Sequence, residues 1–77
     1  MSRFVAANAN GQEFAYGFDR PLGEYFIQLL DGDDDATDLC GFPVNNGTNG
    51  NFLEVVSQYG IQIPDEHLDN VCLDLPI

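Results

Sequence analysis

The chain has 77 residues, of which 13 are acidic and only two, both arginines, are basic, so its formal net charge is −11. A surface so rich in carboxylates repels nucleic acid and acidic membranes and attracts basic protein surfaces. Six phenylalanines, three tyrosines and a hydrophobic fraction of 44% exclude the disorder that is typical of acidic chains poor in aromatic residues. We therefore expect one folded domain over residues 1–77.

The first predicted element is a β-hairpin formed by residues 3–9 and 12–19 around Asn10-Gly11. Asn-Gly is a strong hairpin signal because both central positions of a two-residue turn need a positive φ. The second strand alternates aromatic residues with small or acidic ones, which predicts a half-buried strand. We expect three aromatic side chains to face the core: Phe14, Tyr16 and Phe18.

A two-residue turn also predicts the register of this hairpin. Val5 would lie opposite Tyr16 on the core side, and Phe4 would lie opposite Gly17 on the other side. A large ring beside a glycine is a favourable pairing across two strands. An exposed apolar patch would then lie on the side of the sheet away from the core and offer a surface for a homodimer or another partner: Phe4, Phe26 and Leu30.

Residues 24–31 fit two structures. Their apolar residues follow the spacing of an amphipathic helix, but Tyr25-Phe26-Ile27 favours a strand, and the preceding hairpin has an edge to extend. We predict a strand, with a helix over residues 22–30 as the alternative. After a solvated acidic turn at 31–35, a short fourth strand is predicted over residues 39–44.

A helix is predicted at residues 51–59, where the hydrophobic spacing changes from two to about 3.6 residues. Asn51 can cap it, with Glu54 three residues later as the second half of a capping box. Gly60 stands where a left-handed residue ends many helices, and Ile61 can pack back on the last turn.

A second helix is predicted to open at Pro64, with Asp65 and Glu66 in its first turn, where carboxylates suit the helix dipole. The ending 74–77 is apolar enough to dock on the core. The inner stripe of this helix is predicted to be Leu68, Val71 and Cys72. The fold class is therefore α+β: a three- or four-stranded antiparallel meander followed by two short helices packed on one face.

The cysteine count and the first residues bear on the cellular compartment. Met1-Ser2-Arg3-Phe4 is not a basic start before a long apolar core, so we expect no signal peptide and a cytoplasmic protein. Cys40 and Cys72 are then expected to be buried and reduced, with a disulfide between them as the alternative. No apolar run approaches the roughly 18 residues of a membrane span.

Catalytic and metal sites are not predicted. His67 lies among Asp65, Glu66 and Asp69, so we expect an exposed surface histidine. No residue pattern indicates an activated thiol–histidine pair, and solvated carboxylates lack the pocket that acid–base chemistry needs. Two cysteines and one histidine are also too few for a four-ligand zinc site unless a carboxylate joins them. We expect neither enzymatic activity nor a cofactor, and a small hydrolytic or thiol enzyme is the least favoured alternative.

The acidic run that begins at Asp31 is the nearest approach to a calcium motif. An EF-hand loop starting there would need glycine at its sixth position and glutamate at its twelfth, where this chain has Ala36 and Phe42. A solvated charged turn is therefore predicted, and weak divalent-cation (calcium) binding is kept as an alternative function.

Two segments look like parts of short, uncharacterised bacterial proteins: Tyr16-Gly17-Phe18-Asp19-Arg20-Pro21-Leu22-Gly23-Glu24-Tyr25-Phe26 and Leu73-Asp74-Leu75-Pro76-Ile77. The resemblance extends over about half of the chain and includes no chemical motif. It implies a bacterial or mobile-element source and a cytoplasmic location, and it implies no activity.

These observations predict a non-enzymatic acidic interaction protein that binds a basic protein surface. One form of this function is an inhibitor that mimics nucleic acid and occupies the basic surface of a nuclease or another DNA- or RNA-binding protein. We expect no direct binding of nucleic acid or membranes, and a purely structural or oligomeric role is a further alternative. The expected partner-binding residues are Asp31, Asp33, Asp34, Asp35 and Asp38, with a second patch of Asp65, Glu66 and Asp69.

Overall fold

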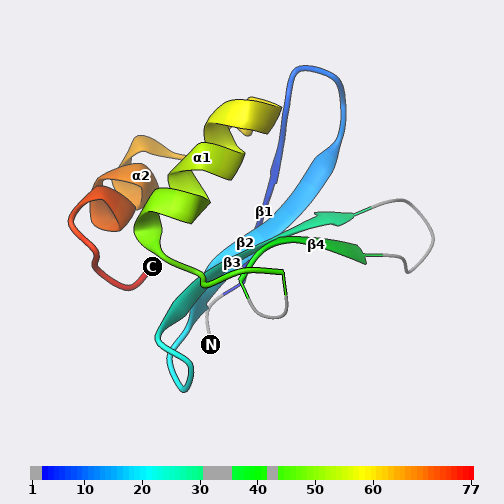
Figure 1. The fold of residues 1–77 in the computed structure, drawn as a ribbon. Coiled ribbons are helices and arrows are strands. Elements are labelled where there is room, and N and C mark those ends of the chain that lie inside the picture. The colour runs from blue at the N-terminus through cyan, green and yellow to red at the C-terminus, as the bar shows by residue number, and fades with distance from the viewer. Residues whose placement is uncertain (1–2, 31–35, 42–43) are drawn as a thin grey trace.

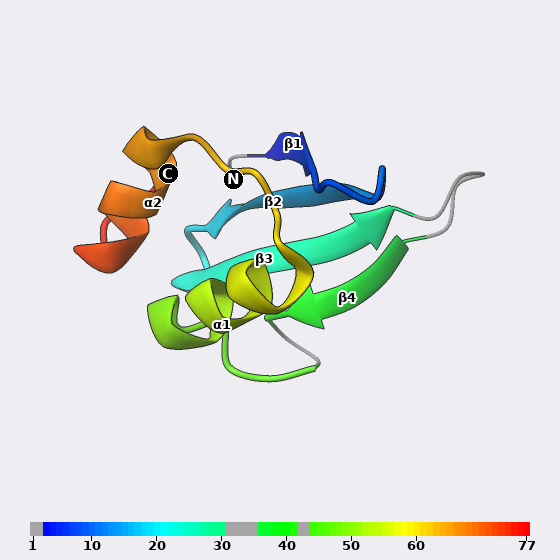
Figure 2. The same ribbon diagram turned by 90° about the horizontal axis from the view of Figure 1, so that it is seen from above.

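A four-stranded sheet and two helices make up the fold in a computed structural model that describes residues 3–30, 36–41 and 44–77. The sheet is antiparallel in the order β1-β2-β3-β4, and both helices lie against the same face of it (Figure 1, Figure 2). The predicted α+β meander is confirmed, including the strand at the third element. The elements are β1 (Phe4–Ala7), β2 (Glu13–Asp19), β3 (Glu24–Leu30), β4 (Ala36–Cys40), α1 (Asn49–Tyr59) and α2 (Asp65–Cys72).

The first hairpin forms where it is predicted, but its register differs by one residue. Phe4 lies opposite Tyr16, and Val5 lies opposite Ala15, so the predicted pairing of Val5 with Tyr16 is wrong. A shift of one residue exchanges the two sides of a strand. Phe4 consequently faces the core, where its ring centroid lies 5.5 Å from that of Tyr16, and Val5 is 58% exposed.

The loop of this hairpin explains the shift. The backbone N–H of Asn8 donates to the carbonyl of Gln12, so three residues separate the strands. The Oδ1 atom of buried Asn8 accepts from the N–H groups of Asn10 and Gln12 at 3.1 and 3.0 Å. Gly11 has a φ of 81°, as expected for the left-handed residue that ends a three-residue hairpin loop.

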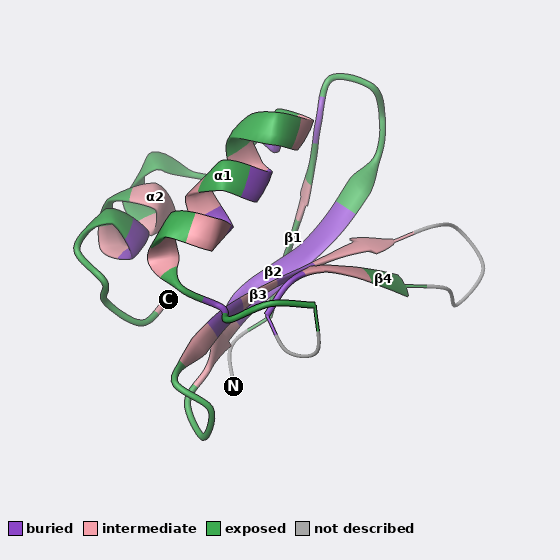
Figure 3. Ribbon diagram, in the orientation of Figure 1, coloured by how far each residue is buried: buried purple, intermediate pink, exposed green. Residues whose placement is uncertain are grey.

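The alternation of side chains divides the sheet into a covered face, against which the helices pack, and an open face (Figure 1). The core lies on the covered face and is closed by Phe52 of α1 and Val71 of α2, both fully buried (Figure 3). Tyr16 is only 2% exposed, as predicted. The buried side chains that the sheet contributes to this core are Phe14, Tyr16, Tyr25, Ile27 and Cys40.

β4 begins three residues before the predicted start at Leu39 and ends at Cys40 instead of continuing to residue 44. Ala36 and Asp38 give no hydrophobic signal, but they pair with Leu30 and Gln28 of β3. Pairing with a strand that is already in place has therefore outweighed the weak local preference of this segment.

The chain then returns to the start of β3. The N–H of Tyr25 donates to the carbonyl of Gly47 at 2.8 Å. A Cβ atom on Gly47 would overlap the carbonyl oxygen of Tyr25 and lie 2.7 Å from the Cβ of Glu24. Only glycine allows this close approach of two backbones.

α1 begins earlier than predicted because its cap is Thr48 and not Asn51. The Thr48 hydroxyl accepts from the N–H of Asn51 at 3.2 Å, and threonine is a favourable cap. The predicted ending is confirmed: Gly60 has a φ of 64°, and the N–H of Ile61 donates to the carbonyl of Val56, as in a Schellman motif.

α2 follows Pro64 as predicted, but its inner stripe differs. Val71 is fully buried and Leu68 packs against the core, whereas Cys72, the last residue of the helix, is exposed. Both cysteines are free. The expectation of two buried thiols is therefore right for Cys40 and wrong for Cys72, and the alternative disulfide does not form.

His67 is half-buried, and the expectation of a surface histidine is wrong. Its Nδ1 atom lies 2.7 Å from the hydroxyl oxygen of Tyr16, and its ring centroid lies 4.4 Å from that of Phe4. The Tyr25 hydroxyl similarly donates to the carbonyl of Leu75 at 2.7 Å, so the C-terminal segment docks as predicted. Two tyrosines of the sheet thus hold the helical layer through their polar ends.

Candidate interaction surface

The open face is the side of the sheet that the helices leave uncovered (Figure 1). Phe26 and Leu30 lie there by the pairing of β3 with β2, as predicted. Phe26 stands directly opposite Gly17. The predicted pairing of a large ring with a glycine therefore exists, but Phe26 supplies the ring in place of Phe4.

Phe26 differs from every other aromatic residue in the described part of the chain. Those other residues are either members of the core cluster or packed against it. Phe26 is half-buried and belongs to neither group, and it forms no ring pair with a described residue. An aromatic ring that the core does not use is a candidate anchor for a partner.

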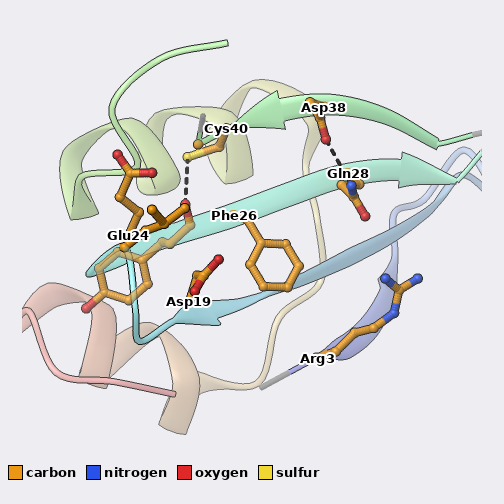
Figure 4. A pocket seen from close by; sticks show the side chains of 10 residues that line it. Arg3, Asp19, Glu24, Phe26, Gln28, Asp38 and Cys40 are labelled. Carbon is orange, nitrogen blue, oxygen red and sulfur yellow. Dashed lines mark hydrogen bonds between the residues drawn. The ribbon is translucent and has the colours of Figure 1, made fainter. Parts of the chain in front are cut away.

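A concavity of about 260 Å³ lies on this face and crosses the sheet from the residue before β1 to β4 (Figure 4). Ten residues line it: Arg3, Asp19, Leu22, Glu24, Tyr25, Phe26, Gln28, Asp38, Cys40 and Gly41. The side chains that give it its chemical character are Arg3, Asp19, Glu24, Phe26, Gln28 and Asp38.

The lining of this concavity is acidic. It has one guanidinium, that of Arg3, and three carboxylates, those of Asp19, Glu24 and Asp38. The Nε2 atom of Gln28 donates to Oδ1 of Asp38 at 2.9 Å (Figure 4). That bond fixes one carboxylate oxygen of Asp38, which lines the same hollow as Phe26, while its second oxygen retains acceptor capacity.

A second hollow of about 430 Å³ lies at the start of α1, between the chain near Gly23 and the segment 46–49. Glu24 lines both hollows, and Asp74 lies in the second. The acidic surface therefore continues from the open face around the start of β3.

The predicted partner-binding residues fall into three groups. Asp38 lines the concavity. The second patch lies on the other layer of the molecule, in α2, and is exposed: Asp65, Glu66 and Asp69. The structure does not bring this patch together with Asp38. The remaining four, Asp31, Asp33, Asp34 and Asp35, lie outside the described residues.

Among the six side chains that give the concavity its chemical character, Arg3, Asp19, Glu24 and Gln28 were not expected from the sequence. A signal for two of them was present, because Glu24 and Gln28 stand two positions on either side of Phe26. Residues at such spacing share one face of a strand. Asp19 and Arg3 join them only through the pairing of β1, β2 and β3, which periodicity along one strand cannot reveal.

The thiol of Cys40 is buried in the core. Burial raises the pKa of the Cys40 thiol to about 11, so at neutral pH it carries its proton and is a poor nucleophile. No group of three or more His, Cys, Asp or Glu side chains in residues 3–30, 36–41 and 44–77 is placed to hold a metal ion.

Neither described helix has the length and apolar character needed to cross a membrane. No protein-family model, curated protein or solved structure matches this chain. The resemblance to bacterial proteins therefore stays a prediction, and the open face is the feature from which a function can be argued.

Proposed function

We propose that this chain is a non-enzymatic acidic interaction protein that binds the basic surface of another protein. The observation that carries the proposal is the open face, where three carboxylates line the same hollow as an aromatic ring that the core does not use. Interfaces often combine an aromatic anchor with polar groups around it.

Long-range electrostatics support a basic partner. The net charge of −11 attracts a positively charged surface, accelerates association and disfavours acidic competitors. The fold also fixes the position of one carboxylate, because Asp38 lies on a paired strand and accepts a hydrogen bond from Gln28. Carboxylates held on a rigid sheet lose less conformational freedom on binding than those of a disordered chain.

The proposed partner is a nuclease or another DNA- or RNA-binding protein, whose basic groove is built to bind phosphates. Carboxylates on the surface of this chain would replace the phosphates in that groove. Such a partner binds nucleic acid mainly through charge, so the acidic chain would compete with nucleic acid and act as an inhibitor.

The test must separate a folded surface from mere negative charge. The control is the variant Tyr16→Ala/Phe52→Ala, which loses two fully buried aromatic rings but keeps the net charge, and whose unfolding is checked by circular dichroism. Both proteins are titrated against a basic ribonuclease and against histone octamers bound to a fluorescent DNA duplex.

We expect the folded protein to inhibit the ribonuclease or displace the DNA at lower concentration than the unfolded control. We also expect the effect to weaken steeply with added salt. Equal activity of the folded and unfolded chains would show that only a polyanion is at work and would overturn the proposal.

A further inference from the structure

We propose that the concavity of the open face is a receptor for one arginine side chain of the basic partner. This inference rests on the proposed function and names the chemical group that is recognised. Its basis is the combination of an available aromatic ring, carboxylates on more than one strand and a hollow of limited size.

The size of the hollow favours a single side chain. Its volume of about 260 Å³ is below the roughly 300–1,000 Å³ of pockets that enclose whole small molecules. It is also open to the protein surface at the level of the strands, so a side chain can enter while the backbone of the partner stays outside.

The chemistry of the lining favours arginine. A guanidinium group is planar, can stack on an aromatic face and presents several N–H donors to carboxylates. Phe26 supplies the ring, and the second oxygen of Asp38 supplies an acceptor. Lysine would satisfy the charge but could not stack in the same way.

The charge balance of the hollow excludes two other occupants. An anionic partner would meet three carboxylates and one arginine. A second copy of this chain would bring another net charge of −11 toward the first, and like charges brought together at an interface are costly. Arg3 also lines this hollow. Because of its positive charge, it should lower the affinity of the hollow for an arginine of the partner and raise its affinity for an anion.

The experiment uses three blocked peptides of glycine residues that carry one central arginine, lysine or citrulline. Their binding to the full chain is followed by NMR through the side-chain amide signals of Gln28, which donates to Asp38. We expect the arginine peptide to bind more tightly than the lysine peptide. The citrulline peptide, which keeps the shape without the charge, should cause no saturable shift.

Four single variants sharpen the test, each checked by its melting temperature. Phe26→Leu keeps an apolar residue and should lower the affinity for the arginine peptide by about fivefold. Asp38→Asn should also lower this affinity. Asp69→Asn makes the same charge change on the exposed surface of α2 and should leave the affinity nearly unchanged. Arg3→Gln should raise the affinity for the arginine peptide.

The outcomes distinguish this inference from the function on which it rests. Unchanged affinity in Phe26→Leu, equal binding of citrulline, or weaker binding in Arg3→Gln would overturn the arginine receptor. Self-association of the free chain that is lost in Phe26→Leu would overturn it in favour of a homodimer. If the ribonuclease is still inhibited only by the folded chain in those cases, the proposed function stands without this site.

Discussion

The two faces of the sheet are built from the same strands and have opposite characters. On the covered face, Tyr16 and Tyr25 are buried and their hydroxyls reach partners in the C-terminal third of the chain. On the open face, Phe26 lies outside the core, and Asp38, which lines the same hollow, is held by Gln28. Because adjacent residues of one strand point to opposite faces, stability and binding can be altered separately in this molecule.

The largest expected contrast between the faces comes from removing one aromatic ring from each. Tyr16→Ala should lower the free energy of unfolding by about 3 kcal/mol or more, because it empties a buried site. Phe26→Ala should cost much less, since that side chain is half-buried and outside the core cluster. Urea unfolding of both variants measures the difference, and similar losses would show that the open face is part of the core.

Alkaline pH should destabilise the covered face. The pKa of Cys40 is about 11 in the folded chain, against a reference value of 9.0. The folded state therefore keeps the proton more tightly, and the stability gained from the neutral thiol is present below pH 9 and lost as the pH rises through 11.

Cys40→Ser removes this titration and should flatten the fall of stability between those two pH values. Part of the fall should persist, because burial also raises the pKa of Tyr16 and Tyr25. Thermal melts at several pH values would provide the comparison. Identical pH profiles for wild type and Cys40→Ser would contradict the assignment to Cys40.

A smaller effect is expected from removing the polar end of a core tyrosine. Tyr25→Phe deletes the hydrogen bond to Leu75 and should cost about 1 kcal/mol. Tyr59→Phe is the matched control, because Tyr59 is half-exposed and should change stability little. Equal effects in denaturant titrations would mean that the hydroxyl of Tyr25 does not hold the C-terminal segment.

For the covered face, the sequence predicted which aromatic residues are buried, but not the register of the first hairpin or the position of His67. Alternation along residues 14–18 identified the buried aromatic rings, because it depends only on neighbouring residues. The register was missed because Asn10-Gly11 fits both two- and three-residue loops, and the side chain of Asn8 selects the longer one. His67 was missed because its partner, Tyr16, lies 51 residues away.

The candidate site could be predicted only in part. Phe26 was expected on the far side of the sheet from the spacing of its own strand. Its neighbours Asp19 and Arg3 reach the same hollow from other segments, and their approach depends on strand pairing. Acidic density along the chain pointed to α2 and to the run Asp31, Asp33, Asp34, Asp35 and Asp38. Asp38 does line the hollow, but acidic density carries no information on where the sheet is concave.

The smallest expected effect concerns the acidic run itself. Replacing Asp33, Asp34 and Asp35 with Asn should leave the melting temperature unchanged or slightly higher, because repulsion among carboxylates falls. For the same reason the wild type should melt at a higher temperature in moderate sodium chloride, which screens charges over roughly 8–10 Å. A large loss of stability in the triple variant would show that this segment supports the fold.

The central claim is that the open face, and not α2, meets a basic partner. NMR mapping of the folded chain with the basic ribonuclease tests it directly, with the side-chain amide of Gln28 reporting on the open face and the backbone amides of 65–69 on α2. We predict saturable shifts at Gln28 at ribonuclease concentrations where the α2 signals do not move. Shifts confined to α2, with Gln28 unmoved, would contradict the account.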